Sequence, residues 1–475
     1  MSHLIAIAFL ASWICGCSTK RDRRTELHQA FEQNDLEAAT QAASQLVDHR
    51  RDGESYTLDS AMIHLASGNL EAFDEAVRGT HRDLSVRRPQ SLASFSVTNT
   101  LDERFRPFRG AGYERALMPV MLSIGSLADD VVDAESYSLI GMQDHRKLQK
   151  QNEETSNLSL TSEHYATVAA VPYLRGILRE ATYRDYDDAT KAYDEVRRAR
   201  PTFQLASASL ERVKSGVPCA KGKGVLHVIA LVDRGPLLVE TSAPTTSEIM
   251  SHASVLIQQL SNRIENDSNN EDKNKEGEED RGGFVLSLPN IIAVKIPTVE
   301  IPQPSIATVA IRVNQTQISN TVTLEDIGEL AIDYWEAETP HAITRAVVRR
   351  SVKELSVALA ADRMGLEGQS RAFFHAAAVN AWAASEKADT RCWSLLPRQI
   401  QVARLELPVG EHSIGLESIG FDRLPLNTSS QTNVRIVDGR NSYLVVMARP
   451  NWIKVIRPRS RSSEQAQSGL TTSSS

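Results

Sequence analysis

Asp35-Leu36-Glu37-Ala38 and Asn69-Leu70-Glu71-Ala72 are two copies of one short pattern, and they lie 34 residues apart (69 − 35). That spacing is the period of tetratricopeptide repeats, in which each unit is a pair of antiparallel helices. Gln33-Asn34 and Gly68-Asn69 would then form the turn inside each pair, and the alanine that ends each copy is small enough for close helix packing. This stretch therefore predicts a helical-repeat fold for the N-terminal half.

Further segments extend the helical region over residues 25–215. Residues 173–201 predict another helical pair, in which four residues fall near consensus places of the repeat with one residue of extra length: Gly176, Ala189, Tyr193 and Pro201. Segments 109–127 and 130–149 are helical in pattern without keeping the period. We predict a degenerate repeat array, which needs several stacked units to bury a continuous core. An ordinary helical bundle is the alternative, because small alanines also occur at its helix crossings.

The pattern changes to short strands near Gly216. Val225–Val232 and Leu237–Glu240 have β-forming composition, and the turn sequence Asp233-Arg234-Gly235-Pro236 between them predicts a hairpin. The remainder of residues 216–458 predicts a helix at 246–262, strands at 284–296 and 306–322, helices at 325–338, 341–363 and 368–386, and β-like runs at 398–419, 432–437 and 441–456. The predicted fold class is α+β, with a helical-repeat (tetratricopeptide-like) array followed by a mixed α/β module with short antiparallel strands.

Two segments are predicted to be disordered. Residues 264–281 carry mixed charge with almost no apolar side chain, so they cannot bury enough surface to offset their ordering entropy. Their acidic residues lack EF-hand spacing, so we predict no metal site there. Residues 459–475 are serine-rich and predict a frayed tail.

Composition excludes several classes of protein. The sequence has 475 residues, a formal net charge of −7, 41% hydrophobic residues and 24% charged residues. This mixture supports ordinary buried cores and excludes a collagen-like chain, a small disulfide scaffold and a mostly disordered protein. The mild acidity argues against a dedicated nucleic-acid binder, which carries a basic face.

The first residues resemble the signal of a bacterial lipoprotein. Leu4–Ile14 is an apolar run of signal-peptide length, too short to span a bilayer as a helix. It leads into Ile14-Cys15-Gly16-Cys17, which resembles the lipobox whose final cysteine is lipidated. We predict a signal peptide over 1–16, a lipid on Cys17 and a tether over 17–24. The serine after Cys17 resembles the signal for the outer membrane, periplasmic face.

A plain signal peptide and an uncleaved buried helix remain alternatives, because residues 1–3 contain no Lys or Arg. Anchoring physics favours the lipid: one acyl chain, at about 0.8 kcal/mol per buried CH₂, holds a protein reversibly, whereas two or three hold it firmly.

Two cysteines remain after processing, Cys219 and Cys392, because Cys15 leaves with the predicted signal and Cys17 is lipidated. An oxidising periplasm permits a disulfide between them, and two free thiols agree equally well with the sequence. Neither lies in a Cys-x-x-Cys pair, so no redox or zinc site is predicted.

The C-terminal half contains two stretches that carry a family resemblance. They are Gly222-Lys223-Gly224-Val225, running on to Glu240, and Glu386-Lys387-Ala388-Asp389-Thr390-Arg391-Cys392-Trp393-Ser394-Leu395-Leu396-Pro397, running on to His412. With them, residues 216–456 resemble an uncharacterised family of bacterial tetratricopeptide-like lipoproteins. The resemblance implies a periplasmic lipoprotein with a cell-envelope role and no assigned activity. The sequence departs from the family in the 264–281 insertion and in Cys392, where other residues are usual, which speaks against a shared disulfide.

The second stretch also predicts a latch between structural elements. Trp393 is a large apolar side chain that would seat the β part against the preceding helix. Arg391 would either pair with Asp389 or stack on Trp393. We interpret Asp389, Arg391 and Trp393 as an inter-element latch rather than as catalytic residues.

No catalytic, cofactor or metal motif stands out. Residues 216–224 resemble a phosphate-binding loop superficially, but five residues separate the first two glycines where four are needed, and the segment enters a strand. One acidic set could suggest paired glycosidase carboxylates, but we interpret it as helix capping and a solvated face: Glu180, Asp185, Asp187 and Asp188. We therefore predict neither cofactor nor nucleotide.

These observations together predict a lipid-anchored cell-envelope protein. The function expected is a non-catalytic scaffold or accessory factor that binds an envelope protein or peptide through the helical-repeat surface. The alternative is a periplasmic cell-wall hydrolase or carbohydrate-active enzyme whose site includes polar residues of 386–412.

Overall fold

The computed structural model describes residues 23–47, 53–86, 107–129, 131–154, 167–217, 219–258, 293–385 and 387–458. The predicted signal peptide (1–16), the 264–281 insertion and the 459–475 tail lie outside the described residues, as do the first six residues of the predicted tether. Residues 23 and 24 begin a helix over 23–32. The tether prediction was therefore wrong at its end, because Arg24 belongs to the folded body.

Helices follow one another through the N-terminal half. After the helix over 23–32 come α2 (Leu36–Val47), α3 (Gly53–Ser67), α4 (Leu70–Ser85), α5 (Gly112–Leu127), α6 (Val131–Glu154), α7 (Ala170–Glu180), α8 (Tyr186–Ala199) and α9 (Gln204–Ser215). From α2 to α9, each helix packs against the next one along the chain. This order of contacts gives a layer of stacked helices.

The two copies of the repeated sequence have matching local geometry. Asn34 and Gly68, the residues before the copies, both adopt left-handed backbone conformations, with φ of 59° and 78°. Asp35 and Asn69 follow them, and each side chain accepts a hydrogen bond from the backbone N–H three residues on, at 3.0 and 3.3 Å. Such side-chain caps satisfy backbone donors that a helix start leaves without partners.

The C-terminal half is built mainly from antiparallel sheets. Its strands are β1 (Lys223–Arg234), β2 (Leu237–Pro244), β3 (Ala293–Glu300), β4 (Ile306–Val313), β5 (Thr316–Asn320), β6 (Val322–Asp326), β7 (Pro397–Pro408), β8 (Gly410–Gly420), β9 (Pro425–Ile436), β10 (Asn441–Arg449) and β11 (Trp452–Val455). They form a five-stranded sheet of order β11-β10-β1-β7-β6, a four-stranded sheet of order β5-β4-β8-β9, and the β2-β3 pair. In the described part of the chain only β1 and β10 pair in parallel. The fold class is therefore α+β, as predicted.

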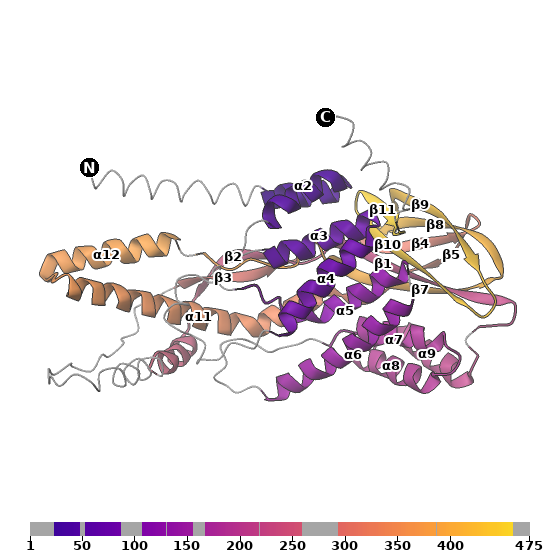
Figure 1. Ribbon diagram of the computed structural model, residues 1–475, viewed down its shortest axis with the longest axis horizontal. Helices are drawn as coiled ribbons and strands as arrows, with labels where there is room; N and C mark the ends of the chain where they lie inside the picture. The colour runs from indigo at the N-terminus through magenta and orange to yellow at the C-terminus, as the bar shows by residue number, and fades with distance from the viewer. Residues whose placement is uncertain are drawn as a thin grey trace, which may run out of the picture.

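Strand β1 lies at the centre of a three-layer arrangement. Its residues Leu226 and Val228 pack against the four-stranded sheet, whereas Ile229 and Leu231 pack against the helices. A strand buried on both faces has a nearly continuous apolar sequence instead of an alternating one. Figure 1 shows α3, α4 and α5 lying beside the five-stranded sheet that contains β1.

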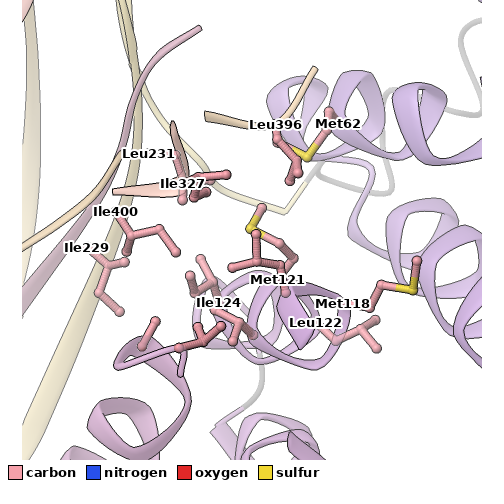
Figure 2. Close-up of a cluster of buried hydrophobic side chains, with 14 of the residues drawn as sticks. Met62, Met118, Met121, Leu122, Ile124, Ile229, Leu231, Ile327, Leu396 and Ile400 are labelled. Atoms are coloured by element: carbon pink, nitrogen blue, oxygen red, sulfur yellow. The ribbon is translucent and has the colours of Figure 1, made fainter. Parts of the chain in front are cut away.

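The helices and the five-stranded sheet share one hydrophobic core. Figure 2 shows Met62 of α3 beside Leu396, and Met121 and Ile124 of α5 between Met62 and the sheet residues Ile229 of β1 and Ile400 of β7. The change from helices to strands falls between the end of α9 and the start of β1, where the sequence pattern changes. Because the core continues across that point, the helical region is not a separate body.

An arm extends from this body (Figure 1, left) and is formed by α11 (Ile327–Arg363), α12 (Gly368–Ser385), β2, β3 and a helix over 247–258. The prediction of two helices at 325–338 and 341–363 was wrong, because α11 continues through Pro340. A proline inside a helix costs about 3 kcal/mol. Packing offsets this cost, since Ala342, Ile343 and Val347 are buried against β3 and the 247–258 helix.

The predicted hairpin between Val225–Val232 and Leu237–Glu240 was also wrong. β1 pairs with β7 and β10, and β2 pairs with β3. The Asp233 carboxylate accepts backbone N–H groups of Ser305 and Ile306 at 2.9 and 2.8 Å, which joins the turn after β1 to the start of β4. The chain then enters β2, which belongs to a different sheet from β1.

The sequence predicts a break between the β-like runs 398–419 and 432–437, but the polar residues 427–430 in that gap lie inside β9. β9 is an edge strand that pairs with β8 from Ile436 to Pro425. Its alternate residues face solvent, so the strand needs few apolar side chains.

Candidate functional site

The segment between α12 and β7 lies where the helices meet the five-stranded sheet. We call residues 388–396 the junction segment. Its last five residues, from Cys392 to Leu396, are each at most 3% exposed. Most of the segment has no regular secondary structure, so its buried backbone N–H and C=O groups need partners from elsewhere.

Asp59 of α3 is a partner of one backbone group and of one side chain of the segment. Its Oδ1 accepts the backbone N–H of Leu395 at 2.9 Å, and its Oδ2 accepts the hydroxyl of Ser394 at 2.7 Å. Asp59 is buried within a helix whose neighbouring side chains are mainly apolar. The carboxylate therefore connects α3 to the junction segment.

Glu114 of α5 holds the neighbouring residue. Its Oε1 accepts the backbone N–H of Trp393 at 2.6 Å, and its Oε2 accepts the backbone N–H of Ala111 at 2.8 Å. The second bond caps the first turn of α5, because Ala111 immediately precedes that helix. One carboxyl group thus fixes both the start of α5 and the junction segment.

Arg24, on the helix over 23–32, completes the set. Its guanidinium donates to the carbonyl oxygen of Thr390 and to Sγ of Cys392, both at 3.0 Å. Three helices of the N-terminal half therefore hold the same short segment through charged side chains.

Burial changes the protonation of the two carboxyl groups. It raises the pKa of Asp59 to about 6, although the hydrogen bonds from Ser394 and Leu395 and the charge of Arg24 favour the ionised form. It raises the pKa of Glu114 to about 7, against hydrogen bonds from Trp393 and Ala111, and the negative charge of Asp59 adds to this rise. Both groups can therefore exchange a proton near neutral pH.

The predicted latch residues lie within the junction segment. Arg391 pairs with Asp389, one of the two partners that the sequence left open: Nη2 lies 2.6 Å from Oδ2, and Nε lies 2.8 Å from Oδ1. Trp393 is 1% exposed and packs in the shared core. Sequence reasoning missed the partners on the helices, and the signal that could have found one was a lone acidic residue in the apolar stretch of α3.

A third buried carboxyl connects the sheet to the helices at another place. Glu325 of β6 accepts the backbone N–H groups of Ala169 and Ala170 at 2.5 and 3.2 Å, at the start of α7. Nη2 of Arg200 lies 2.9 Å from its Oε1. Arg200 also pairs with the more exposed Glu329 at 2.8 Å. Burial raises the pKa of Glu325 in spite of these partners.

The acidic residues predicted to cap helices and face solvent have different environments in the structure. Asp185 and Asp188 are partly exposed and pair with Arg179, at 3.1 and 3.0 Å. Glu180 is 2% exposed, so the solvated interpretation was wrong for it. It lies between α7 and α9, where it pairs with Arg212 and accepts the hydroxyl of Tyr193 at 2.7 Å. These basic and phenolic partners indicate a structural role.

Cys219 and Cys392 are both free thiols in the structure, so the disulfide left open by the sequence is not formed. Cys392 is buried beside Arg24, and burial raises the pKa of its thiol to about 11. Cys219 lies 3.6 Å from the hydroxyl of Tyr183.

A pocket of about 120 Å³ lies between α4, α5 and α6. His81 Nε2 lies 2.9 Å from Oδ2 of Asp144, and Lys147 Nζ lies 3.4 Å from the other oxygen. Ser85 also lines the pocket, but its hydroxyl donates to the carbonyl oxygen of Arg82 at 2.7 Å. Among the described residues, the Ser85 hydroxyl therefore donates to a backbone carbonyl oxygen and not to His81, the base that would activate it.

Among the described residues, no group of three or more His, Cys, Asp and Glu side chains is placed to hold a metal ion. Within the same ranges, none of the helices combines the length and the apolar character that crossing a bilayer requires.

Comparison of the chain with known protein families, with characterised proteins and with solved structures finds no match.

Proposed function

We propose that this protein is a lipid-anchored, non-catalytic scaffold of the bacterial cell envelope, and that its helical layer binds another envelope protein. Three observations support the proposal: the lipobox-like sequence at Cys17, the stacked helices, and an exposed apolar patch on one of them. The resemblance of residues 216–456 to tetratricopeptide-like lipoproteins agrees with it.

In this proposal the helices form a degenerate tetratricopeptide-type array. The matched left-handed turns at Asn34 and Gly68 support it. So does Gly176, since a Cβ atom there would lie 2.6 Å from the ring of Tyr193. A small residue of one helix facing an aromatic ring of the next permits the close packing that such pairs need.

The observation that carries the proposal is an apolar patch on α6, made of Val131, Val132, Leu139 and Ile140. These side chains are 38–69% exposed. Val132 and Leu139 are seven residues apart, which places them on the same side of the helix two turns from each other. Apolar side chains that gather on one exposed face mark a protein-interaction surface.

The double substitution V132D/L139D is expected to lower partner capture at least about tenfold, because two charges would have to be desolvated in the interface. A photo-crosslinker at the exposed Ser136, between them, would report capture in intact cells, followed by mass spectrometry of the joined protein.

The matched control is Val217→Asp, which changes an equally exposed apolar residue (59%) beyond the end of α9. It should leave capture unchanged, and both variants should keep the wild-type melting temperature. Equal loss in both variants, or no crosslinked protein in the wild type, would refute the proposed surface.

Cys17→Ser is expected to move the protein from the membrane fraction to the aqueous fraction and to abolish labelling by radioactive palmitate. The physical reason is that serine lacks the thiol that carries the lipid, and the described part of the chain has no membrane-spanning helix to replace it. Cys15→Ser is the control, since the lipobox allows a variable residue there. Palmitate labelling that persists in Cys17→Ser would contradict the anchor.

The alternative function, a cell-wall hydrolase, finds its strongest support in the His81–Asp144 pair and its pocket. A serine hydrolase needs the histidine within hydrogen-bond reach of the nucleophile. Ser85 donates elsewhere. We therefore favour the scaffold.

A further inference from the structure

Two carboxyl groups of the helical layer and the guanidinium of Arg24 meet at the junction segment. Asp59 and Glu114 hold consecutive parts of one chain segment, through Leu395, Ser394 and Trp393. Arg24 lies against the same segment. When both carboxyls are ionised, the cluster therefore carries an excess negative charge in a buried place. An uncompensated buried charge is unfavourable, and a proton on either carboxyl removes it.

Other cations near the segment have acidic partners of their own. Arg449 of β10 donates to the carbonyl oxygen of Leu395 at 3.0 Å and faces Glu32 and Asp233. Arg234 faces Glu32 and Glu300, and Arg391 pairs with Asp389. Glu240 of β2 accepts the backbone N–H of Ala388 at 2.8 Å and pairs with Lys295. Burial lowers the pKa of His28, on the helix of Arg24, so it is neutral. Arg24 is therefore the cation that acts on the two carboxyls.

The neutral titratable groups are Tyr56 on α3, Tyr113 on α5, Tyr334 on α11 and Cys392 in the junction segment. Burial raises the pKa values of Tyr113 and Cys392, so both stay neutral at physiological pH. A phenol or thiol can lose a proton only to become negative, which would increase the imbalance.

We propose that Asp59, Glu114 and Arg24 form a proton-controlled lock between the helical layer and the sheet. While one carboxyl keeps its proton, the junction segment stays bound to α3 and α5, which is the closed lock. When both carboxyls are ionised, the segment opens more readily. This inference does not depend on the envelope partner proposed above.

The sign of the effect follows from the pKa values. Asp59 and Glu114 hold their protons more tightly in the folded protein than in an opened segment, where carboxyls have ordinary pKa values. As the pH rises from about 4 to about 7, the opened form loses protons first and is favoured. Opening of the junction segment therefore becomes easier with rising pH and levels off once both groups are ionised in both forms.

Hydrogen exchange of the Trp393 and Leu395 amides in the full-length protein tests the lock. After correction for intrinsic exchange rates, wild-type protection should fall at least about tenfold between about pH 5.5 and pH 8, since one pKa unit corresponds to a factor of ten. In the double variant D59N/E114Q, whose side chains do not ionise, protection should change less than about twofold over that range. Asp185→Asn, which removes a partly exposed carboxyl, should keep the wild-type response.

Two outcomes would overturn the lock: constant protection in the wild type, or an unchanged pH response in D59N/E114Q. Because the double variant could fail to fold, infrared spectra of the wild type give a second measurement. They should show protonated buried carboxyl groups at about pH 5.5 that disappear by about pH 8. Absence of that signal at the lower pH would also refute the proposal.

Discussion

Glu325→Ala is expected to lower the free energy of unfolding by about 3–5 kcal/mol, because it removes one partner of a buried ion pair. In the native protein this carboxylate is fully buried, accepts two backbone N–H groups at the start of α7 and pairs with Arg200. The alanine variant would leave all three donors without this partner. Urea denaturation followed by circular dichroism would measure the change.

Glu329→Ala is the matched control for that experiment. Glu329 pairs with the same arginine, but its side chain is 58% exposed, and exposed ion pairs contribute about 0–1 kcal/mol. Glu325→Gln keeps a carbonyl oxygen that can accept an N–H group, so it should cost less than alanine. If Glu325→Ala is no more damaging than Glu329→Ala, β6 and α7 are not held together by this carboxylate.

Gly125→Ala is expected to destabilise the protein by about 1–3 kcal/mol through overpacking. Gly125 lies on α5, and a Cβ atom there would overlap the ring of Phe73. That ring is 2% exposed and has little room to move. Phe73 directly follows the second copy of the repeated sequence, so the glycine marks the contact between α4 and the next helix. Thermal unfolding would report the loss.

Gly79→Ala is the control for the glycine substitution. Gly79 lies inside α4, and a Cβ atom added there would meet nothing within 4 Å, so alanine should stabilise the helix by about 0.5–1 kcal/mol. Combining Gly125→Ala with Phe73→Leu should recover part of the loss, because the smaller side chain makes space. Additive losses in that double variant would contradict the proposed contact.

Local features of the fold could be predicted from the sequence. The turns at Asn34 and Gly68 and the caps that follow depend on residues a few positions apart, so a short pattern contains the necessary information. The class α+β follows from the same kind of evidence, since helical and β-forming segments are segregated along the chain.

Strand partners could not be predicted in the same way. Val225 of β1 pairs with Asn441 of β10, more than 200 residues away, and a turn-like sequence after β1 favoured the nearer partner. Pro340 is similar, because its local tendency to end a helix was overcome by packing against β3 and the 247–258 helix.

Of the candidate site, only the junction segment could be predicted from the sequence, and its partners on the helices could not. Asp389, Arg391 and Trp393 identified the junction segment, since a tryptophan among charged residues is visible in the sequence. Asp59 and Glu114 lie more than 270 residues before it, and although Asp59 is an acidic residue among apolar neighbours, the sequence connects neither residue with this segment. Their role depends on burial, which a single sequence does not record.

The length of α11 gives the arm mechanical leverage. A helix of 37 residues is about 55 Å long at 1.5 Å per residue. Its first residue, Ile327, comes two positions after Glu325, so its base is fixed beside the contact between β6 and α7. A rotation of about 5° there would displace the far end near residue 364 by about 5 Å. Small rearrangements of the buried ion pairs at the base of α11 would thus produce displacements of several ångströms at the far end of the arm.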